Sequence, residues 1–157
     1  MYKNIKYLFY DFDGVMTDNR VLVDENGIEA VFVNRSDGLA VSMLKIAGFS
    51  QMIVSTEKNP VVSMRAKKLA IPVLYGVENK GLAIRDYIIT NNIDRHDALY
   101  IGNDINDLSA FNEVGVKACP SDAYAQVKDI SDIVIDCKGG FGVIRELYNI
   151  LTYMSAI

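Results

Sequence analysis

The stretch Tyr-Leu-Phe-Tyr-Asp-Phe-Asp-Gly, residues 7–14, is an apolar run that ends in two carboxylates and a glycine. A short apolar and aromatic run of this kind predicts a buried β-strand from about Ile5 to Asp11. Residues two apart in an extended chain point to the same side, so Asp11 and Asp13 can face one point beyond the strand. Two carboxylates this close repel each other unless a cation lies between them. The pattern favours a Mg²⁺ site with a nucleophilic aspartate, and a turn with two solvated acids is the alternative.

Strand-like and helix-like segments alternate along the rest of the chain. We expect further strands near residues 51–55, 73–75, 98–102, 116–119 and 133–136. Helices are expected over about 36–47, from 59–60 onward, over 80–91, after Asp107 to about 113, and over 123–128 and 143–153. This alternation predicts an α/β protein with a Rossmann-like three-layer α/β/α architecture and a mainly parallel central sheet. Ligands of such sheets bind beyond the carboxyl ends of the strands.

The dipeptide Asn26-Gly27 lies between two β-rich runs just after the acidic loop. Asn-Gly in this setting is the strongest short signal for a β-hairpin. We therefore expect a hairpin insertion over about residues 19–34. The chain shows no linker, repeat or low-complexity segment, so residues 1–157 are expected to form a single domain.

Composition narrows the classes of partner. Half of the residues are hydrophobic, 23% are charged, and the formal net charge is -4. This balance argues against nucleic acid or an anionic membrane as a partner. No apolar run reaches the length of a membrane helix, and the N-terminal run is too short for a secretory leader, so a cytoplasmic location is expected. Cys119 and Cys137 have no metal-type spacing and are expected to be reduced and buried.

Polar residues follow the ends of several predicted strands. In chain order they are Asp11 and Asp13, Ser55, Lys80 at a helix start, and Asp104 and Asp107 in the run Gly102-Asn103-Asp104-Ile105-Asn106-Asp107. Each has an ordinary alternative: Ser55 can cap a helix, Lys80 can be a solvated lysine, and the two later acids can be favoured by a helix dipole. Their joint occurrence in this order on one α/β chain favours a common site.

With these motifs the chain resembles the haloacid dehalogenase-like phosphohydrolases over essentially its whole length. The resemblance implies a phosphoric monoester hydrolase that works through an aspartyl-phosphate, with Asp11 as nucleophile. Asp13 would protonate the leaving alcohol and then deprotonate the attacking water. Mg²⁺ would be bound by the carboxylate of Asp11, the backbone carbonyl of Asp13 and the carboxylate of Asp104.

The same resemblance implies roles for the other motif residues. Ser55, Thr56 and Lys80 would bind the phosphate, and Lys80 would also neutralise charge between Asp11 and the phosphate. Asp107 would orient Lys80 or a metal-bound water.

Most members of this family carry a cap domain, and here the two possible insertions are too small to form one. The chain resembles the capless 3-deoxy-octulosonate 8-phosphate and acylneuraminate 9-phosphate phosphatases in its hairpin, in Asn-Arg-Ser-Asp-Gly at 34–38, and in the Gly-Gly-Phe-Gly segment starting at 139. This branch implies a 2-keto-3-deoxy sugar acid phosphate as substrate, in lipopolysaccharide or sialic acid biosynthesis. It also implies a homotetramer built through the hairpins, with a neighbour covering each site.

The chain departs from the octulosonate branch after its second strand, where that branch usually has Thr-Gly-Arg. Here the residues are Ser55, Thr56 and Glu57. Glu57 suits a polyol better than a sugar carboxylate, and Arg65 and Lys68 on the next helix could then bind the carboxylate. The pattern favours a nine-carbon nonulosonate 9-phosphate and leaves the octulosonate 8-phosphate open.

Two other functions compete with a phosphatase. A non-catalytic tetramerisation module, similar to the C-terminal domain of animal acylneuraminate cytidylyltransferases, would have lost catalytic acids, whereas Asp11, Asp13, Lys80 and Asp104 are all present. A phosphate-accepting receiver domain would need an aspartate after a central strand, where Ser55 stands. Both comparisons favour the phosphatase.

Overall fold

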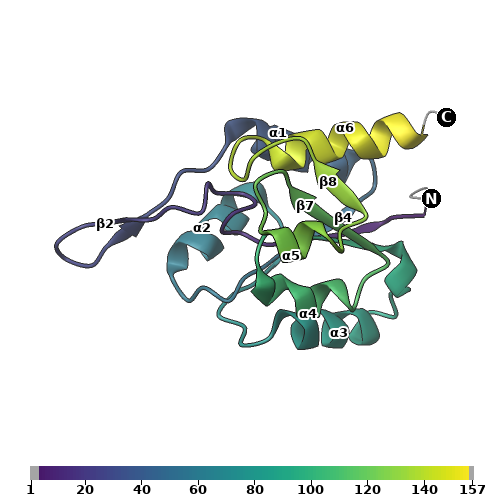
Figure 1. The fold of residues 1–157 in the computed structure, drawn as a ribbon, viewed down its shortest axis with the longest axis horizontal. Coiled ribbons are helices and arrows are strands. Elements are labelled where there is room, and N and C mark those ends of the chain that lie inside the picture. The colour runs from purple at the N-terminus through teal and green to yellow at the C-terminus, as the bar shows by residue number, and fades with distance from the viewer. Residues whose placement is uncertain (1–3, 156–157) are drawn as a thin grey trace.

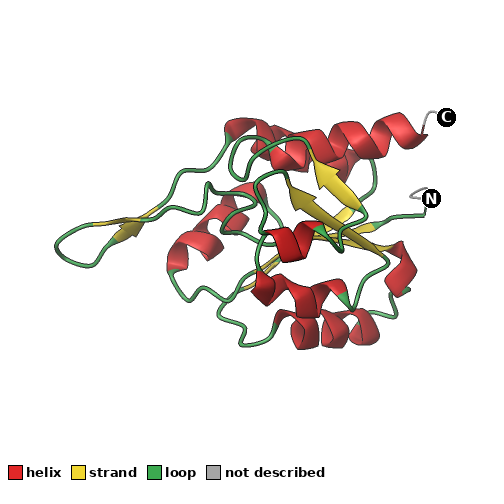
Figure 2. Ribbon diagram, in the orientation of Figure 1, coloured by secondary structure: helices red, strands yellow, loops and turns green. Residues whose placement is uncertain are grey.

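The computed structural model describes residues 4–155, and its centre is a parallel sheet (Figures 1 and 2). The strands are β1 (Tyr7–Tyr10), β4 (Ser50–Val54), β5 (Val73–Leu74), β6 (Ala98–Ile101), β7 (Val116–Pro120) and β8 (Ile133–Ile135). They form one six-stranded sheet in the order β5-β4-β1-β6-β7-β8, with every pairing parallel. The predicted α/β fold is confirmed, and β1 is central, with β4 and β6 on either side.

Helices cover both faces of this sheet. One layer contains α1 (Arg35–Ile46), α2 (Pro60–Leu69) and α6 (Val143–Ser155), and the other contains α3 (Lys80–Thr90), α4 (Leu108–Phe111) and α5 (Ala125–Lys128). Figure 1 shows α1 and α6 on one side of the strands and α3 and α4 on the other. The three-layer architecture is therefore confirmed.

The alternation of side chains along β1 explains its uninterrupted apolar run. Leu8 and Tyr10 belong to the core cluster under α1 and α6, whereas Phe9 belongs to the cluster under α3 and α4. Successive side chains of a strand point to opposite faces, and both faces here are covered. The strand is thus held rigidly from both sides, and the residues that follow Tyr10 emerge at a defined position.

Asparagine caps set the starts of the longer helices. The side chains of Asn34, Asn59 and Asn79 accept hydrogen bonds from backbone N–H groups in the first turns of α1, α2 and α3. Such caps satisfy donors that have no partner within the helix. Because Asn79 is the cap of α3, Lys80 becomes its first residue, at the end of the helix that faces the sheet edge.

The predicted hairpin is present and consists of β2 (Leu22–Val23) and β3 (Glu29–Ala30), paired antiparallel. It projects from the body of the molecule beyond the end of β1 (Figure 1). Oδ1 of Asp24 accepts hydrogen bonds from the backbone N–H groups of Asn26 and Ile28, and Gly27 takes a φ of +77°, which glycine tolerates best. The paired segment is shorter than the β-rich sequence. Outside it, the two flanks of the hairpin are connected by an isolated bridge between Thr17 and Val33.

Neither insertion point carries a cap domain within residues 4–155. The chain between Ser55 and Lys80 forms only α2 and the short strand β5. In this described part of the chain, no helix has the length and apolar character needed to cross a bilayer. Both cysteines are free; Cys119 is buried as expected, and Cys137 is only partly so.

Candidate active site

Apart from Asp107, the residues predicted from the strand ends line one small cavity at the carboxyl edge of the sheet. Its volume is about 80 Å³, and its lining includes Asp11, Asp13, Ser55, Thr56, Lys80 and Asp104, together with Asn19, Asn103 and Asn106. These residues come from the ends of β1, β4 and β6 and from the start of α3. Parallel strands end at the same edge of a sheet, which is why segments far apart in sequence meet there.

A buried ion-pair network includes two of the residues that line this cavity, Asp11 and Lys80. Nζ of Lys80 lies 2.7 Å from Oδ1 of Asp11 and 2.7 Å from Oδ1 of Asp107. The exposed fractions of these residues are 1% for Lys80, 5% for Asp11 and 0% for Asp107. Charges this deeply buried are retained only when they are paired and hydrogen-bonded. Asp107 therefore contacts Lys80, which is one of the two partners expected for it from the sequence.

The environment shifts the pKa values of the network. Burial would lower the pKa of Lys80, but the carboxylates of Asp11 and Asp107 outweigh it and raise that pKa, so the ammonium stays charged. Burial and the charge of Asp107 raise the pKa of Asp11 to about 8, although Lys80 opposes the shift. With two carboxylates for one ammonium, this edge of the sheet is short of positive charge.

Asp107 is held by more partners than the sequence suggested. Its Oδ1 also accepts a hydrogen bond from the hydroxyl of Tyr100 at 2.6 Å. Its Oδ2 accepts from the backbone N–H groups of Asn103 at 2.8 Å and Asp104 at 3.2 Å. Tyr100 is fully buried in β6, and nothing in its sequence context distinguished it from an ordinary core tyrosine. The carboxylate of Asp107 thus fixes both Lys80 and the loop after β6.

The loop after β1 is tightened by Thr17, a fully buried residue that the sequence analysis did not single out. Its Oγ1 accepts hydrogen bonds from the backbone N–H of Gly14 at 3.3 Å and of Asn19 at 3.2 Å. Gly14 has a φ of +83°, which favours glycine. This turn places Asp11 and Asp13 at the same cavity.

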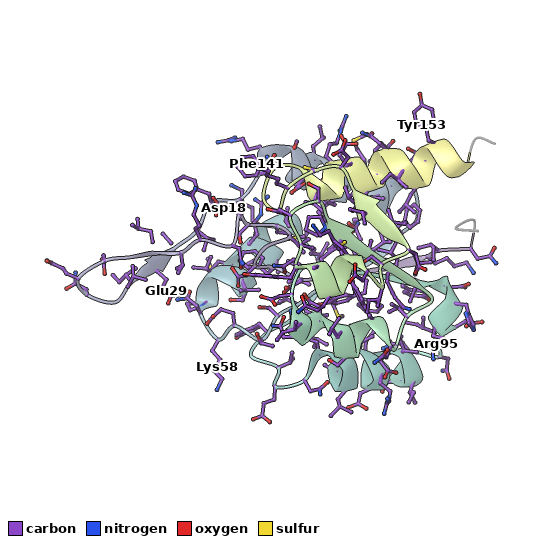
Figure 3. All side chains as sticks on the ribbon, in the orientation of Figure 1. Asp18, Glu29, Lys58, Arg95, Phe141 and Tyr153 are labelled. Atoms are coloured by element: carbon purple, nitrogen blue, oxygen red, sulfur yellow. The ribbon has the colours of Figure 1, made fainter. Side chains whose placement is uncertain are left out.

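A larger cavity of about 260 Å³ adjoins the small one, since Asp13 and Asn19 line both. It lies between the base of the hairpin and the start of α2, and Glu57 and Glu29 contribute to its wall. Figure 3 shows Glu29 at the hairpin, and Asn59 donates to its Oε2 at 3.1 Å. Burial, then the charges of Glu57 and Glu29, raise the pKa of Asp13.

Ser55 and Thr56 follow β4 and differ in exposure. Ser55 is 2% exposed, and its Oγ accepts a hydrogen bond from the backbone N–H of Glu57 at 3.1 Å. Thr56 is exposed and lines the small cavity beside it. Both are positioned to meet an anion that enters this cavity.

Within one chain, Arg65 and Lys68 do not line either of the two cavities beside Asp13. They line a separate cavity of about 450 Å³ with Arg35, and it shares no lining residue with the two cavities described above. Arg65 is half-buried rather than fully exposed, because its Nη2 donates to the carbonyl oxygen of Asn34 at 3.0 Å.

The small cavity offers oxygen atoms, the ligands that Mg²⁺ prefers. The side-chain amide of Asn103 lies 2.8 Å from the carbonyl oxygen of Asp13 and 3.1 Å from Oδ2 of Asp11. Oδ1 of Asp104 accepts a hydrogen bond from the backbone N–H of Ile105 at 2.7 Å. Oxygen donors and an excess of negative charge fit a divalent cation.

Comparison with known sequences and structures gives a consistent result. A sequence model of the haloacid dehalogenase-like hydrolases matches residues 57–147. The 3-deoxy-D-manno-octulosonate 8-phosphate phosphatase KdsC of Haemophilus influenzae is 31% identical over 150 residues, which cover 95% of this chain and 83% of the relative.

Two solved structures share the fold over nearly the whole chain. A protein of Streptomyces avermitilis assigned to the HAD hydrolases is 42% identical with a TM-score of 0.92, covering 95% of this chain and 91% of its own. The octulosonate 8-phosphate phosphatase of Moraxella catarrhalis, solved with a magnesium ion, a phosphate ion and a KDO molecule, is 28% identical with a TM-score of 0.94. That match covers 99% of this chain and 90% of the other.

Proposed function

The chain belongs to the haloacid dehalogenase-like hydrolase family and is a phosphoric monoester hydrolase, and we propose that it removes the terminal phosphate from a 2-keto-3-deoxy sugar acid with the help of Mg²⁺. The observation that carries the proposal is the meeting of Asp11, Lys80 and Ser55 in one small cavity that opens beside Asp13 into a larger one. The small cavity suits a phosphoryl group, and the larger one suits the sugar.

Asp11 is the proposed nucleophile. Its Oδ1 accepts hydrogen bonds from the backbone N–H of Phe12 and from Lys80, each at 2.7 Å, so the carboxylate is fixed in orientation. A new bond forms between a carboxylate oxygen and phosphorus while the bond from phosphorus to the sugar oxygen breaks, which gives an aspartyl-phosphate. Water then attacks the phosphorus of this intermediate, which releases phosphate and restores Asp11.

Asp13 is the proposed general acid and base. It gives its proton to the leaving sugar oxygen and then takes a proton from the attacking water. Burial and the nearby charges of Glu57 and Glu29 raise its pKa, which favours the protonated form that the first step requires. Its place between the two cavities supports this role.

The phosphate is proposed to bind to Ser55, Thr56 and Lys80. The positive end of α3 adds to the charge of Lys80, because Lys80 is the first residue of that helix. Asp107 keeps the ammonium of Lys80 in place.

A divalent cation is proposed to bind to the carboxylate of Asp11 and the backbone carbonyl of Asp13, with Asp104 as the further acidic ligand predicted from the sequence. When bound, the cation would neutralise charge on the phosphate and so allow an anionic nucleophile to approach it. The magnesium ion in the Moraxella catarrhalis enzyme supports this choice of metal.

The substrate's sugar part is proposed to lie against Glu57 in the larger cavity, where a carboxylate can accept hydrogen bonds from hydroxyl groups. Arg65 and Lys68 line a different cavity. They can contact a substrate carboxylate only if a neighbouring chain presents them. This requirement, together with the apolar hairpin, supports assembly into a homotetramer.

Phosphate release from a panel of substrates tests the proposal. The panel contains octulosonate 8-phosphate, two nonulosonate 9-phosphates and simple hexose phosphates, each with Mg²⁺ and with EDTA. We expect Mg²⁺-dependent release with a strong preference for one of the keto sugar acids. Equal rates on hexose phosphates would contradict the substrate class, and undiminished release in EDTA would contradict the role of the metal.

A variant at Glu57 sharpens the assignment. In Glu57→Arg, the side chain is the one usual in the octulosonate branch, so the preference should move toward octulosonate 8-phosphate. Glu78→Arg, which makes the same charge change at a residue outside both acidic cavities, is the matched control. Equal preferences in the two variants would show that Glu57 does not contact the sugar.

A further inference from the structure

Asn19 lies where the two cavities beside Asp13 meet. Within residues 4–155, Asp13 and Asn19 are the residues that line both the small cavity and the larger one. The phosphoryl group is proposed to bind in the small cavity and the sugar in the larger one. A substrate that spans both cavities therefore passes Asn19 at the linkage between its phosphate and its sugar.

The turn that carries Asn19 is connected to the proposed general acid. Oγ1 of Thr17 accepts a hydrogen bond from the backbone N–H of Asn19 at 3.2 Å and donates one to Oδ1 of Asp13 at 3.4 Å. Thr17 is fully buried, and its hydroxyl uses its single proton in this contact. The position of Asn19 is thus tied to the carboxyl group that is proposed to protonate the leaving oxygen.

The backbone of Asn19 is in the left-handed region, with a φ of +66°. Glycine adopts this region freely, whereas a side chain adds steric strain that asparagine tolerates better than most residues. The turn is also tightly packed, because a Cβ atom on Gly140 would lie only 2.5 Å from the backbone nitrogen of Asp18. Backbone strain that the surroundings impose in this way is typical of functional sites. What asparagine offers here, and glycine does not, is a carboxamide.

The carboxamide of Asn19 is exposed and has no hydrogen-bond partner among residues 4–155. Its two neighbours in the turn, by contrast, satisfy each other. Nε and Nη2 of Arg20 donate to Oδ2 of Asp18 at 2.9 Å and 2.7 Å. This turn lies at the base of the hairpin, where Figure 3 labels Asp18. Asn19 therefore has a side chain that is free to contact a ligand.

The acidic wall of the larger cavity determines which ligand group suits this amide. Glu29 and Glu57 bring carboxylates to the wall, and the amide of Asn59 is already donating to Glu29 at 3.1 Å. A substrate hydroxyl can donate its one proton to a carboxylate, and its oxygen can still accept a hydrogen bond from another group. The NH₂ group of Asn19 is a donor placed to make that second bond.

From this position we infer that Asn19 is a specificity-determining residue, whose NH₂ group donates to the hydroxyl on the carbon next to the one that carries the phosphate. The inference rests on the phosphatase function proposed above and adds a requirement to it. The favoured substrates are primary phosphate esters with a hydroxyl on the adjacent carbon. The terminal phosphates of octulosonate and nonulosonate sugars are esters of this kind, and Asn19 itself takes no part in bond breaking.

The test measures phosphate release by the full chain with Mg²⁺ from glycerol 1-phosphate and from 3-hydroxypropyl phosphate, which differ only in the hydroxyl on the middle carbon. The wild type should show a kcat/KM about fivefold to tenfold higher for the ester with this hydroxyl, because one hydrogen bond is made to that ester alone. Asn19→Gly should lower the preference to about twofold or less.

The same comparison is made with the preferred sugar acid phosphate and its analogue that lacks the adjacent hydroxyl. This second pair decides the result if the small esters react too slowly to measure. Equal kcat/KM values for the two members of the pair in the wild type would contradict the inference. A preference that Asn19→Gly leaves unchanged would contradict it as well.

Thermal melting separates a contact with substrate from a structural role. Asn19→Gly relieves the backbone strain, so its melting temperature should stay the same or rise while the preference falls. Asn19→Asp keeps the size of the side chain but has no donor, and it should lose the preference too. A fall of several degrees in the melting temperature of Asn19→Gly would show that the carboxamide supports the fold, which contradicts a side chain free for substrate.

Asn106→Ala is the matched control, because it removes an exposed amide that lines the small cavity and not the larger one. Its preference between the two esters should equal that of the wild type, whatever happens to the rate. An equal loss of preference in Asn106→Ala and Asn19→Gly would show that the effect is not specific to Asn19 and would overturn the inference.

Failure of the inference and failure of the proposed function give different results. If Asn19→Gly lowers kcat/KM equally for both esters, the amide contacts the phosphoryl group, so the phosphatase stands and only the inference falls. If the wild type releases phosphate from no ester of either pair or of the substrate panel, the proposed function itself is contradicted.

Discussion

The carboxyl edge of the sheet and the β2–β3 hairpin differ in whether their side chains find partners within the chain. At the edge, Lys80 contacts both Asp11 and Asp107 at 2.7 Å, and all three are buried. On the hairpin and its flanks, apolar side chains face solvent: Leu22 is 68% exposed and Phe32 is 78% exposed. The hairpin is joined to α2 through the hydrogen bond between Asn59 and Glu29.

This difference indicates which parts of the function a single chain can perform and which parts need a second chain. The charged groups of the edge find their partners within the chain, so the proposed chemistry needs no neighbour. A projecting two-stranded hairpin with exposed apolar residues is marginally stable alone and has free edges. Assembly and coverage of the substrate are therefore expected to depend on contacts between chains.

Asp11→Asn gives the largest expected effect, because it removes the nucleophile while preserving the size of the side chain. We expect turnover to fall by about 10⁴-fold or more. The melting temperature should not fall, since one of two buried like charges is removed. Steady-state phosphate release and thermal melting check both statements; substantial residual activity would remove Asp11 from its role.

Lys80→Met is expected to have the next largest effect. It leaves the buried carboxylates of Asp11 and Asp107 without their ammonium, which should lower the free energy of unfolding by about 3–5 kcal/mol. Tyr100→Phe is the matched control, because it removes one hydrogen bond to Asp107 but no charge and should cost about 1–2 kcal/mol. Urea unfolding in EDTA measures both, and equal losses would show that the ion pairs add nothing to stability.

Asp37 is a buried carboxylate that, among residues 4–155, has no ammonium or guanidinium group in hydrogen-bond contact, unlike Asp11 and Asp107. It is 2% exposed, and its Oδ1 accepts from the backbone N–H of Arg145 at 3.0 Å. Burial raises its pKa from 3.8 to about 6. The folded protein therefore binds this proton more tightly than the unfolded chain, and the associated stability is present below pH ~4 and lost as the pH rises through ~6.

The measurement is the unfolding free energy of the wild type relative to Asp37→Asn, which cannot ionise, between pH 4 and 7. This difference should fall by up to about 3 kcal/mol as the pH rises. Other carboxyl groups titrate in the same range but are common to both proteins. A difference that stays constant over this range would show that Asp37 is already ionised in the folded state at low pH.

Polar substitutions on the hairpin are expected to change assembly and to leave the ion pairs of the edge intact. Leu22→Ser should weaken association by roughly 2 kcal/mol for each such side chain that a partner covers. Ile89→Ser, at an apolar residue of α3 that is 67% exposed, is the matched control. Sedimentation velocity distinguishes them, and a wild type that sediments as a monomer would contradict the tetramer.

The elements of the fold could be predicted because their signals are local. The run at 7–10 alternates between two covered faces, and Asn26-Gly27 marks the hairpin turn. The strands and helices predicted along the chain are present within residues 4–155, with ends shifted by a few residues. The grouping of Asp11, Ser55, Lys80 and Asp104 at one cavity could also be predicted, because parallel strands end at one edge.

Other features depend on contacts that no local pattern encodes. Asn103 and Asp104 are adjacent in sequence, and only the path of the turn after β6 decides which of them faces Asp11. The sequence identifies Tyr100 only as a core residue, and the hydrogen bond from its hydroxyl to Asp107 becomes evident only in the structure. Arg65 and Glu57 line different cavities, although only seven residues separate them in sequence. The cytoplasmic location and the homotetramer stay predictions from sequence.

The most direct test of the account is chemical trapping of the intermediate. An acyl phosphate is reduced by borohydride to an alcohol, which would convert the trapped aspartate to homoserine. After quenching during turnover of the preferred sugar acid phosphate, peptide mass spectrometry should find homoserine at position 11 and not at position 13. Homoserine elsewhere, or an unmodified peptide at demonstrated turnover, would contradict an aspartyl-phosphate on Asp11.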